Sequence, residues 1–242
     1  DLMRIFKKIL LFLLISGLLF IFFKKEFFLD ISGQTLKKFS SYSDIVLNEV
    51  YLSGRINESK INIIDAIDVS IGELLVNINV KNIRQNLNKL SWVKESSVYL
   101  LPMGKLEIEI YEYIPFSRYI DESNTIYLIN KDGIKFKKIE DNRFENLFLL
   151  YGKDALLNIN ELPLIINKLN SFNFKVTKIE RIDSRRWNIF FKQDFFIKLP
   201  NFNALNSLDA LYKLDNNIDY NNLTFIDLRI QDRVSLKYKS VD

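Results

Sequence analysis

The chain has 242 residues, which is enough for one or two domains, each with its own hydrophobic core. It contains no cysteine and no histidine, which excludes disulfides, thiol chemistry and the commonest acid–base and metal-binding side chain. The formal net charge of +4 is spread along the chain without a basic-plus-aromatic motif, so nucleic-acid binding is not indicated.

The first feature along the chain is the uncharged apolar run at residues 9–23. As a helix it spans roughly 22 Å, and with the preceding turn, where Lys7 and Lys8 can reach the headgroups, roughly 28 Å. A cleaved signal peptide is the alternative, but no A-x-A-like cleavage site follows. We therefore predict an uncleaved, single-pass transmembrane helix within residues 1–29, followed by a polar linker at 30–42.

Residues 43–114 show the order strand, helix, helix, strand, strand. The expected strands are 45–52, 92–100 and 106–110, and the expected helices are 58–67 and 80–90.

Two asparagines suit the starts of these helices. Asn57 is expected to cap the first helix and Asn79 the second. In the first helix, Ile61, Ile64 and Ile67 recur at helical spacing and define its expected apolar face.

Residues 115–242 are rich in short alternating runs and are expected to form one long antiparallel sheet with two helices. The expected strands are 116–120, 125–129, 134–137, 147–151, 176–182, 187–192, 195–199, 223–229 and 234–238, and the expected helices are 156–169 and 203–216. Pro163 fits the first of these helices only within a first turn. The fold class is therefore α+β.

The tail carries the strongest functional signal. Val234, Leu236 and Tyr238 alternate with polar residues, and no further strand follows them in the sequence. A strand in that position is a candidate sheet edge, which can accept a strand from another chain. Lysines on edge strands commonly prevent pairing, so Lys237 and Lys239 indicate either a guarded edge or an acidic partner. A proline at Ser235 or Lys237 is expected to abolish partner binding where the amide it removes points outward, and only one of the two sites need show the effect.

Several local ion pairs and core positions can also be predicted. Trp92 and Trp187 are expected in the cores of the two halves, each near apolar helix faces. Asp227 and Arg229 suit a local ion pair at the end of a strand. Arg185 and Arg186 either pair with Asp183 and Asp194 or contact a partner.

Six motifs in this order resemble one family. They are the segment around Trp92 and Val93, the Glu112–Pro115 step, the Asp132–Gly133 turn, Tyr151–Gly152, the Arg185-Arg186-Trp187 run with Leu199–Pro200, and Asp227-Leu228-Arg229 with Asp232–Arg233. The pattern resembles the bacterial cell division FtsQ/DivIB family, whose first extracytoplasmic domain is a polypeptide-transport-associated (POTRA) domain. The departures are Ser91 in place of a proline, a turn at 102–105 that is one residue longer, and Ile230 at a position where the family sometimes has an aromatic residue.

The resemblance implies a division of the chain and a cellular role. It implies an N-terminal stub and membrane helix at 1–29, a linker at 30–42, a POTRA domain at 43–114 and a C-terminal β domain at 115–242. It further implies a single-pass type II protein of the inner membrane, with its bulk in the periplasm and enriched at the division septum. Such a protein binds the coiled-coil proteins FtsB and FtsL and other divisome proteins, and thereby regulates septal peptidoglycan synthesis.

The expected partner-binding residues cluster in the tail, with one outlier. They are Arg186, Phe225, Arg229, Ile230, Asp232, Arg233, Val234, Leu236 and Tyr238. We expect no catalytic residues, no metal and no cofactor, because the carboxylates show no glycosidase-like pairing and no nucleophile lies near a base. The alternative function is a POTRA-containing secretion or outer-membrane assembly factor, which usually carries several POTRA repeats or a membrane barrel.

Overall fold

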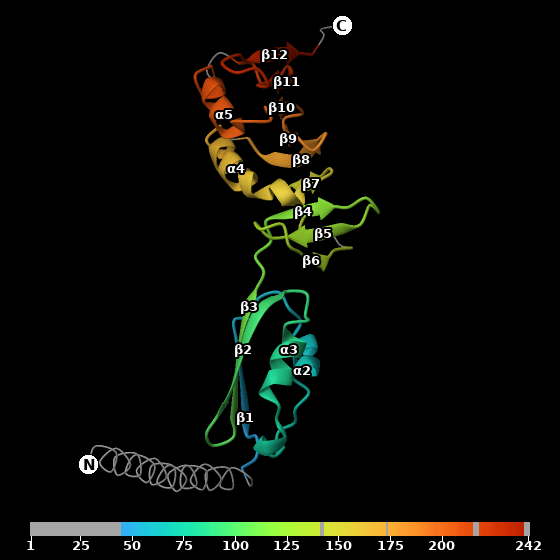
Figure 1. The fold of residues 1–242 in the computed structure, drawn as a ribbon, viewed down its shortest axis with the longest axis vertical. Helices are drawn as coiled ribbons and strands as arrows, with labels where there is room; N and C mark the ends of the chain where they lie inside the picture. The colour runs from blue at the N-terminus through green and yellow to red at the C-terminus, as the bar shows by residue number, and fades with distance from the viewer. Residues whose placement is uncertain (1–44, 141–142, 173, 215–217, 240–242) are drawn as a thin grey trace, which may run out of the picture. The chain divides into compact units, whose positions relative to one another are not determined.

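The computed structural model describes residues 45–140, 143–172, 174–214 and 218–239 (Figure 1). The chain divides into two compact units, Asp1–Tyr111 and Glu112–Asp242. The predicted membrane helix at 1–29 and the linker at 30–42 lie outside the described residues. Within the described ranges, no helix has both the length and the apolar character needed to cross a bilayer.

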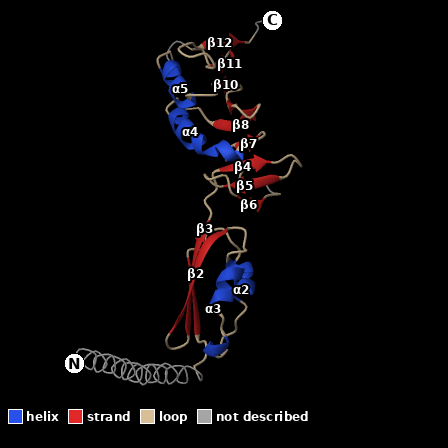
Figure 2. Ribbon diagram, in the orientation of Figure 1, coloured by secondary structure: helices blue, strands red, loops and turns tan. Residues whose placement is uncertain are grey.

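The N-terminal unit is a three-stranded sheet with two helices on one face (Figure 2). Its elements are β1 (Glu49–Ser53), α2 (Lys60–Ile67), a 3-10 helix (Leu75–Asn77), α3 (Val80–Leu87), β2 (Val93–Leu101) and β3 (Lys105–Glu112). The strand order is β1-β3-β2, with β1 parallel to β3. The predicted order of strand, helix, helix, strand, strand is confirmed.

The start and the apolar face of α2 both differ from the prediction. The N-cap is Ser59, whose side chain accepts a hydrogen bond from the amide of Ile61, so the helix begins later than expected and Asn57 is not its cap. Ile61 and Ile64 are exposed, and the buried side chain on this turn is Ile63. A neighbouring isoleucine therefore defines the apolar face, since Ile63 and the end of the helix pack against the strands.

Buried Glu58 explains the shifted start of α2. Its carboxylate accepts hydrogen bonds from the amide of Ser59 and the side chain of Asn62, and its second oxygen accepts one from the amide of Trp92 at 3.2 Å. Because Glu58 turns inward to satisfy these donors, the helix can begin only after it. Trp92 is itself buried, as predicted.

The prediction for α3 is confirmed at its start, where the Asn79 side chain accepts a hydrogen bond from the amide of Asn82.

The C-terminal unit contains one nine-stranded sheet. Its elements are β4 (Ser117–Ile120), β5 (Ile126–Ile129), β6 (Lys135–Lys138), β7 (Leu149–Tyr151), a 3-10 helix (Leu156–Glu161), α4 (Leu162–Asn170), β8 (Val176–Ile182), β9 (Arg186–Phe191), β10 (Phe196–Lys198), α5 (Ala204–Tyr212), β11 (Leu223–Asp227) and β12 (Ser235–Tyr238). The strand order is β12-β11-β10-β9-β8-β7-β4-β5-β6. Pro163 lies in the first turn of α4, the position expected of a tolerated proline.

The expectation of a purely antiparallel sheet is wrong. The pairs β4/β7, β7/β8 and β10/β11 are parallel. Parallel neighbours require a crossover connection, and α4 supplies one between β7 and β8, as α5 does between β10 and β11. The sheet is therefore mixed, with both helices on one face (Figures 1 and 2).

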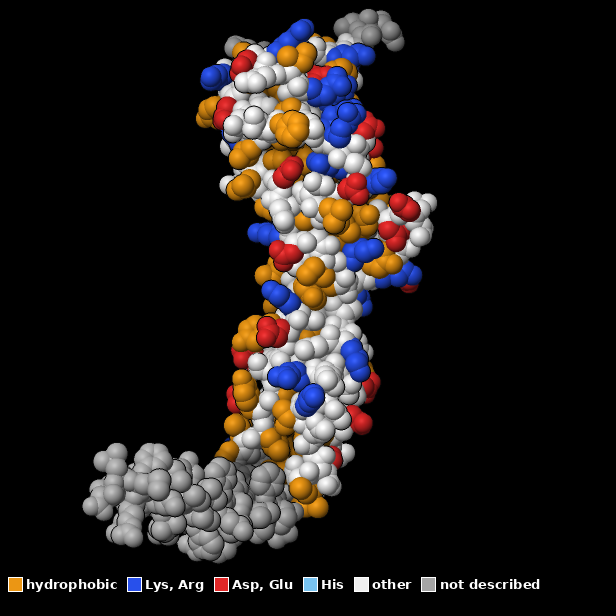
Figure 3. Space-filling view, viewed as in Figure 1, with side chains coloured by type: hydrophobic (Ala, Val, Ile, Leu, Met, Phe, Trp, Pro, Cys, Tyr) orange, Lys and Arg blue, Asp and Glu red, His pale blue; other side chains and the backbone are white. Residues whose placement is uncertain are grey.

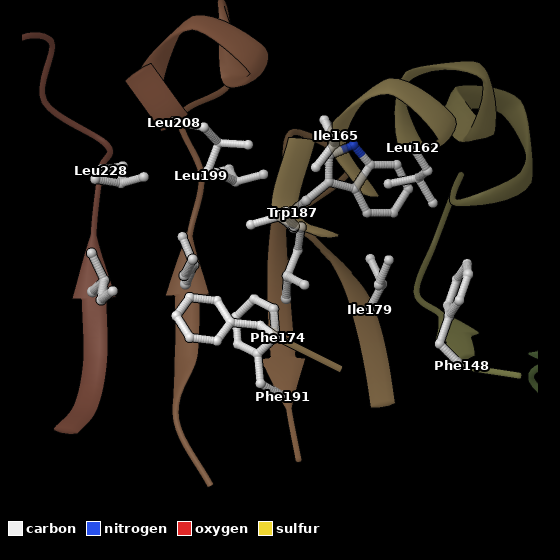
Figure 4. Packing of buried hydrophobic residues seen from close by; sticks show 14 of the residues in the cluster. Phe148, Leu162, Ile165, Phe174, Ile179, Trp187, Phe191, Leu199, Leu208 and Leu228 are labelled. Carbon is white, nitrogen blue, oxygen red and sulfur yellow. The ribbon is translucent and has the colours of Figure 1, made fainter. Parts of the chain in front are cut away.

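The buried face of this sheet carries an aliphatic row that is in register from β7 to β12. Its members are Leu150, Ile179, Ile189, Ile197, Ile226 and Leu236. Trp187 lies in the same core, with its indole directed toward Leu162 and Ile165 of α4 (Figure 4). Its Nε1 donates to Glu161 Oε2 at 3.0 Å, so the predicted buried tryptophan has its polar partner. This face packs against α4 and α5, and among the described elements no helix covers the opposite face of the strands.

Candidate partner-binding edge

The last strand of the described chain, β12, lies at one end of the nine-stranded order. It pairs antiparallel with β11 through Leu236 opposite Ile226 and Ser235 opposite Asp227, with a bulge between Leu223 and Phe225. In the part of the chain that the structure describes, no strand pairs with its other side. The edge position predicted for the tail is therefore present.

The amides of β12 have a defined direction. The Lys239 amide donates to the Asn222 carbonyl at 2.7 Å, so it points toward β11. Amide direction alternates along an antiparallel strand, so the amides of Ser235 and Lys237 also point inward, whereas those of Leu236 and Tyr238 point outward. The proposed proline positions, Ser235 and Lys237, are thus corrected to Leu236 and Tyr238.

The apolar side chains of the tail that were predicted to contact a partner divide into two groups by their burial. Val234 and Leu236 are half-buried and pack against the core of the unit, so they hold β12 in place. Ile230 and Tyr238 are 60% and 42% exposed. The exposed apolar surface next to the edge therefore comes from these two residues.

Arg229 is bound within its own chain. Its backbone amide and guanidinium both donate to Asp227, with Nη2 to Oδ2 at 2.6 Å and Nε to Oδ1 at 2.9 Å. Asp227 is largely buried and Arg229 is half exposed. These hydrogen bonds hold the pKa of the Asp227 carboxyl below its ordinary value and raise the pKa of Arg229. The predicted ion pair is present, and it closes the turn that leads from β11 toward β12.

The Asp227–Arg229 pair predicts a pH effect. Because the folded-state pKa of Asp227 is depressed, its contribution to stability is present above the unfolded-state pKa and is lost as the pH falls through the folded-state pKa. Asp227→Asn should therefore cost roughly 1 kcal/mol at neutral pH, a difference that shrinks under acid conditions. Urea melts over a pH series measure it. Asp232→Asn, which removes the same charge on the adjacent turn, is the control, and a pH-independent difference for Asp227→Asn would contradict the linkage.

A hollow of about 440 Å³ lies between the start of α5 and the loop that joins β11 to β12. It is lined by Pro200, Asn201, Phe202, Asn203, Asn206, Ser207, Asp209, Ala210, Lys213, Leu228, Arg229, Ile230, Gln231, Asp232 and Arg233. Four predicted partner-binding residues thus meet here. Phe202, which is 79% exposed near Pro200, was not predicted from the sequence; an aromatic residue between a proline and a helix start was the available signal.

Two predicted residues lie elsewhere. Arg186 is on β9, three strands from β12, where its guanidinium lies 3.6 Å from Asp183. Arg185 pairs with the same aspartate at 3.5 Å. Phe225 is on β11 but points to the face of the sheet opposite the one that carries Leu236. The predicted residues therefore do not share one surface. Arg229, Ile230, Asp232 and Arg233 line the hollow, whereas Phe225 and Arg186 lie on the face of the sheet opposite Leu236.

Among the residues that the structure describes, no group of three or more acidic side chains is arranged to hold a metal ion.

The family models decide the relationship. The model for the C-terminal part of cell division protein FtsQ/DivIB matches residues 118–229, and the model for the FtsQ-type POTRA domain matches residues 46–113. The chain belongs to the FtsQ/DivIB family. Together the two matches include all of β1 to β3 and β5 to β11, and all of β4 except its first residue.

Curated relatives agree with this assignment. Cell division protein FtsQ of Agrobacterium fabrum is 23% identical over 207 residues, covering 82% of this chain and 63% of that protein. The FtsQ proteins of Rickettsia prowazekii and Rickettsia bellii are 27% and 29% identical, each covering 76% of this chain and 68% of the relative. The match thus spans slightly less than two thirds of the Agrobacterium protein's length.

Proposed function

We propose that this chain is a non-enzymatic interaction protein of cell division that captures a partner strand at β12. The partners are FtsB and FtsL, and capture links them to other division proteins and regulates septal peptidoglycan synthesis. The residues proposed to contact them are Arg229, Ile230, Asp232, Arg233 and Tyr238.

The observation that carries the proposal is the open side of β12. Its outward amides at Leu236 and Tyr238 are free of the β11 ladder, so a partner strand can pair with them through its backbone. Val234 and Leu236 anchor the strand from the core side, so β12 is already in place before a partner arrives. Exposed Tyr238 and Ile230 can then select the side chains of the added strand.

Co-purification tests this function. The full chain, extracted from membranes in detergent, should retain FtsB, whereas a chain that ends after Arg229 should not. Because Val234 and Leu236 pack on the core, a circular-dichroism melt must show that the shortened chain still folds. Retention of FtsB by the folded, shortened chain would contradict capture at β12.

The proposed location gives a separate prediction. If residues 1–29 form an uncleaved type II anchor, a reporter fused after residue 242 and active only in the periplasm should be active. The protein should also stay in the membrane pellet after salt and alkali washing. A soluble periplasmic product lacking the first thirty or so residues would instead show cleavage.

The alternative of a secretion or assembly factor is less favoured. The POTRA unit matches the FtsQ-type model, and the C-terminal unit matches the FtsQ/DivIB model. Enrichment at the septum in cells would support the division role, and an even distribution around the envelope would favour the alternative.

A further inference from the structure

The face of the C-terminal sheet that α4 and α5 leave uncovered carries a second row of side chains in register. It runs from β8 to β12 through Lys178, Phe190, Phe196, Phe225 and Lys237. Three phenylalanines thus lie on neighbouring strands between two lysines. Figure 3 shows basic side chains gathered along the side of this unit away from the helices.

Phe190 and Phe196 stack, and Phe225 lies tilted against Phe196. The centroids of Phe190 and Phe196 are 4.9 Å apart at an interplanar angle of 21°, and those of Phe196 and Phe225 are 5.6 Å apart. The Lys178 ammonium lies 3.9 Å from the centroid of Phe190, and the Lys198 ammonium lies 3.7 Å from that of Phe225. Each ring therefore has a neighbouring ring or an ammonium group beside it, and all three rings are half-exposed.

The acidic side chains in the same face are engaged. Asp227 lies opposite Lys198 in the next row but binds the guanidinium of Arg229. Glu180 accepts a hydrogen bond from Tyr151. Burial and this hydrogen bond together raise the pKa of Tyr151 strongly. In the described part of the chain, neither carboxylate forms an ion pair with Lys178, Lys198 or Lys237.

We propose that this row docks an acidic polypeptide segment that lies across the strands. The ammonium groups of Lys178, Lys198 and Lys237, which lie beside the rings, attract carboxylates. Apolar side chains interspersed with the acids can pack against the half-exposed rings.

Docking on this row would deepen the proposed function, and the identity of its partner rests on that proposed function. It ends at Lys237 on β12, beside the edge that accepts the partner strand. From β8 to β12 are four strand spacings, or roughly 19 Å, which about six extended residues can cover. The same partner chain can therefore pair with β12 and place an adjoining acidic segment over the row.

The test uses the full chain in detergent, with fluorescent poly-L-glutamate and the FtsB captured by co-purification as probes. The row variant is Lys178→Gln with Lys198→Gln; Lys198 belongs to the next row, but its ammonium lies over Phe225. The change keeps part of each stem over its ring and should weaken both interactions about tenfold, or roughly 1.4 kcal/mol. The matched control is Lys60→Gln with Lys81→Gln, which makes the same charge change on helices of the other unit and should leave binding unchanged. Binding by the unmutated chain should weaken as salt rises.

Each outcome decides the matter. Wild-type affinity of the row variant for both probes, or an equal loss in the control variant, overturns the proposal. So does a row variant that loses binding to phosphatidylglycerol vesicles but not to polyglutamate, since the surface would then face lipid. If the row variant weakens FtsB binding while Tyr238→Pro does not, docking on the row is supported and capture of a strand at β12 is contradicted. If only Tyr238→Pro weakens FtsB binding, docking on the row is contradicted and capture at β12 is supported.

Discussion

Replacing Trp187 with alanine is expected to destabilise the C-terminal unit by about 3–5 kcal/mol. The side chain is fully buried among α4 and the strands, so its removal leaves a large cavity (Figure 4). The change also removes the donor to Glu161 and the ring that lies 4.5 Å from the Arg181 guanidinium. Arg181 is itself buried, with an Nε that has no hydrogen-bond partner, so losing the ring leaves its guanidinium with the Glu161 carboxylate, 3.9 Å away, as its ion-pair partner.

The two tryptophans of the chain provide the measurement. In Trp187→Ala the remaining indole fluorescence comes from Trp92 in the N-terminal unit, while circular dichroism reports both units. Urea melts should show an earlier circular-dichroism transition and an unshifted Trp92 transition. Trp187→Phe, which keeps a ring, should cost less, and Leu157→Ala at an 80% exposed site should cost under about 0.5 kcal/mol. An unshifted circular-dichroism transition in Trp187→Ala would contradict the role of the indole.

The strands of the C-terminal unit could be predicted because one face of the sheet is buried and the other is not. Ile179, Ile189 and Ile226 point to the helices, and Lys178 and Phe190 point away, which produces the alternation in the sequence. Whether neighbouring strands run parallel or antiparallel leaves no such alternation in the sequence. A parallel and an antiparallel neighbour bury the same alternating face, so only the crossovers through α4 and α5 distinguish them.

The start of α2 shows a second limit. Asn57 and Ser59 are both good N-cap residues two positions apart, and local preference does not choose between them. Burial of Glu58 against the amide of Trp92 makes the choice, through a contact across 34 residues. A long-range hydrogen bond of this kind leaves no trace in local sequence.

The tail shows what alternation can and cannot predict about a site. It identified β12, its edge position and the side chains that share a face. It did not reveal that Val234 and Leu236 face the core, because an apolar stripe looks the same whether it meets the core or a partner. The row of phenylalanines was missed because its members lie on three strands that only the register aligns.

Replacing Tyr238 with proline is expected to weaken FtsB binding by roughly ten- to a hundredfold, which corresponds to about 1–3 kcal/mol. The Tyr238 amide points away from β11, so the substitution removes a donor that only an added strand would use. The proline ring also projects into the space where that strand would lie. The β11–β12 ladder keeps its inward amides, so the melting temperature of the C-terminal unit should change little.

Two variants separate the amide from other effects. Tyr238→Ala removes the half-exposed ring but keeps the amide, so it measures the side chain alone. Lys237→Pro removes an inward amide and should lower the stability of the β11–β12 pair itself. Calorimetry of FtsB binding, with a melting curve for each variant, gives both quantities. If Tyr238→Pro folds normally and binds as tightly as Tyr238→Ala, the backbone of β12 does not receive the partner, and the hollow beside Phe202 becomes the better site.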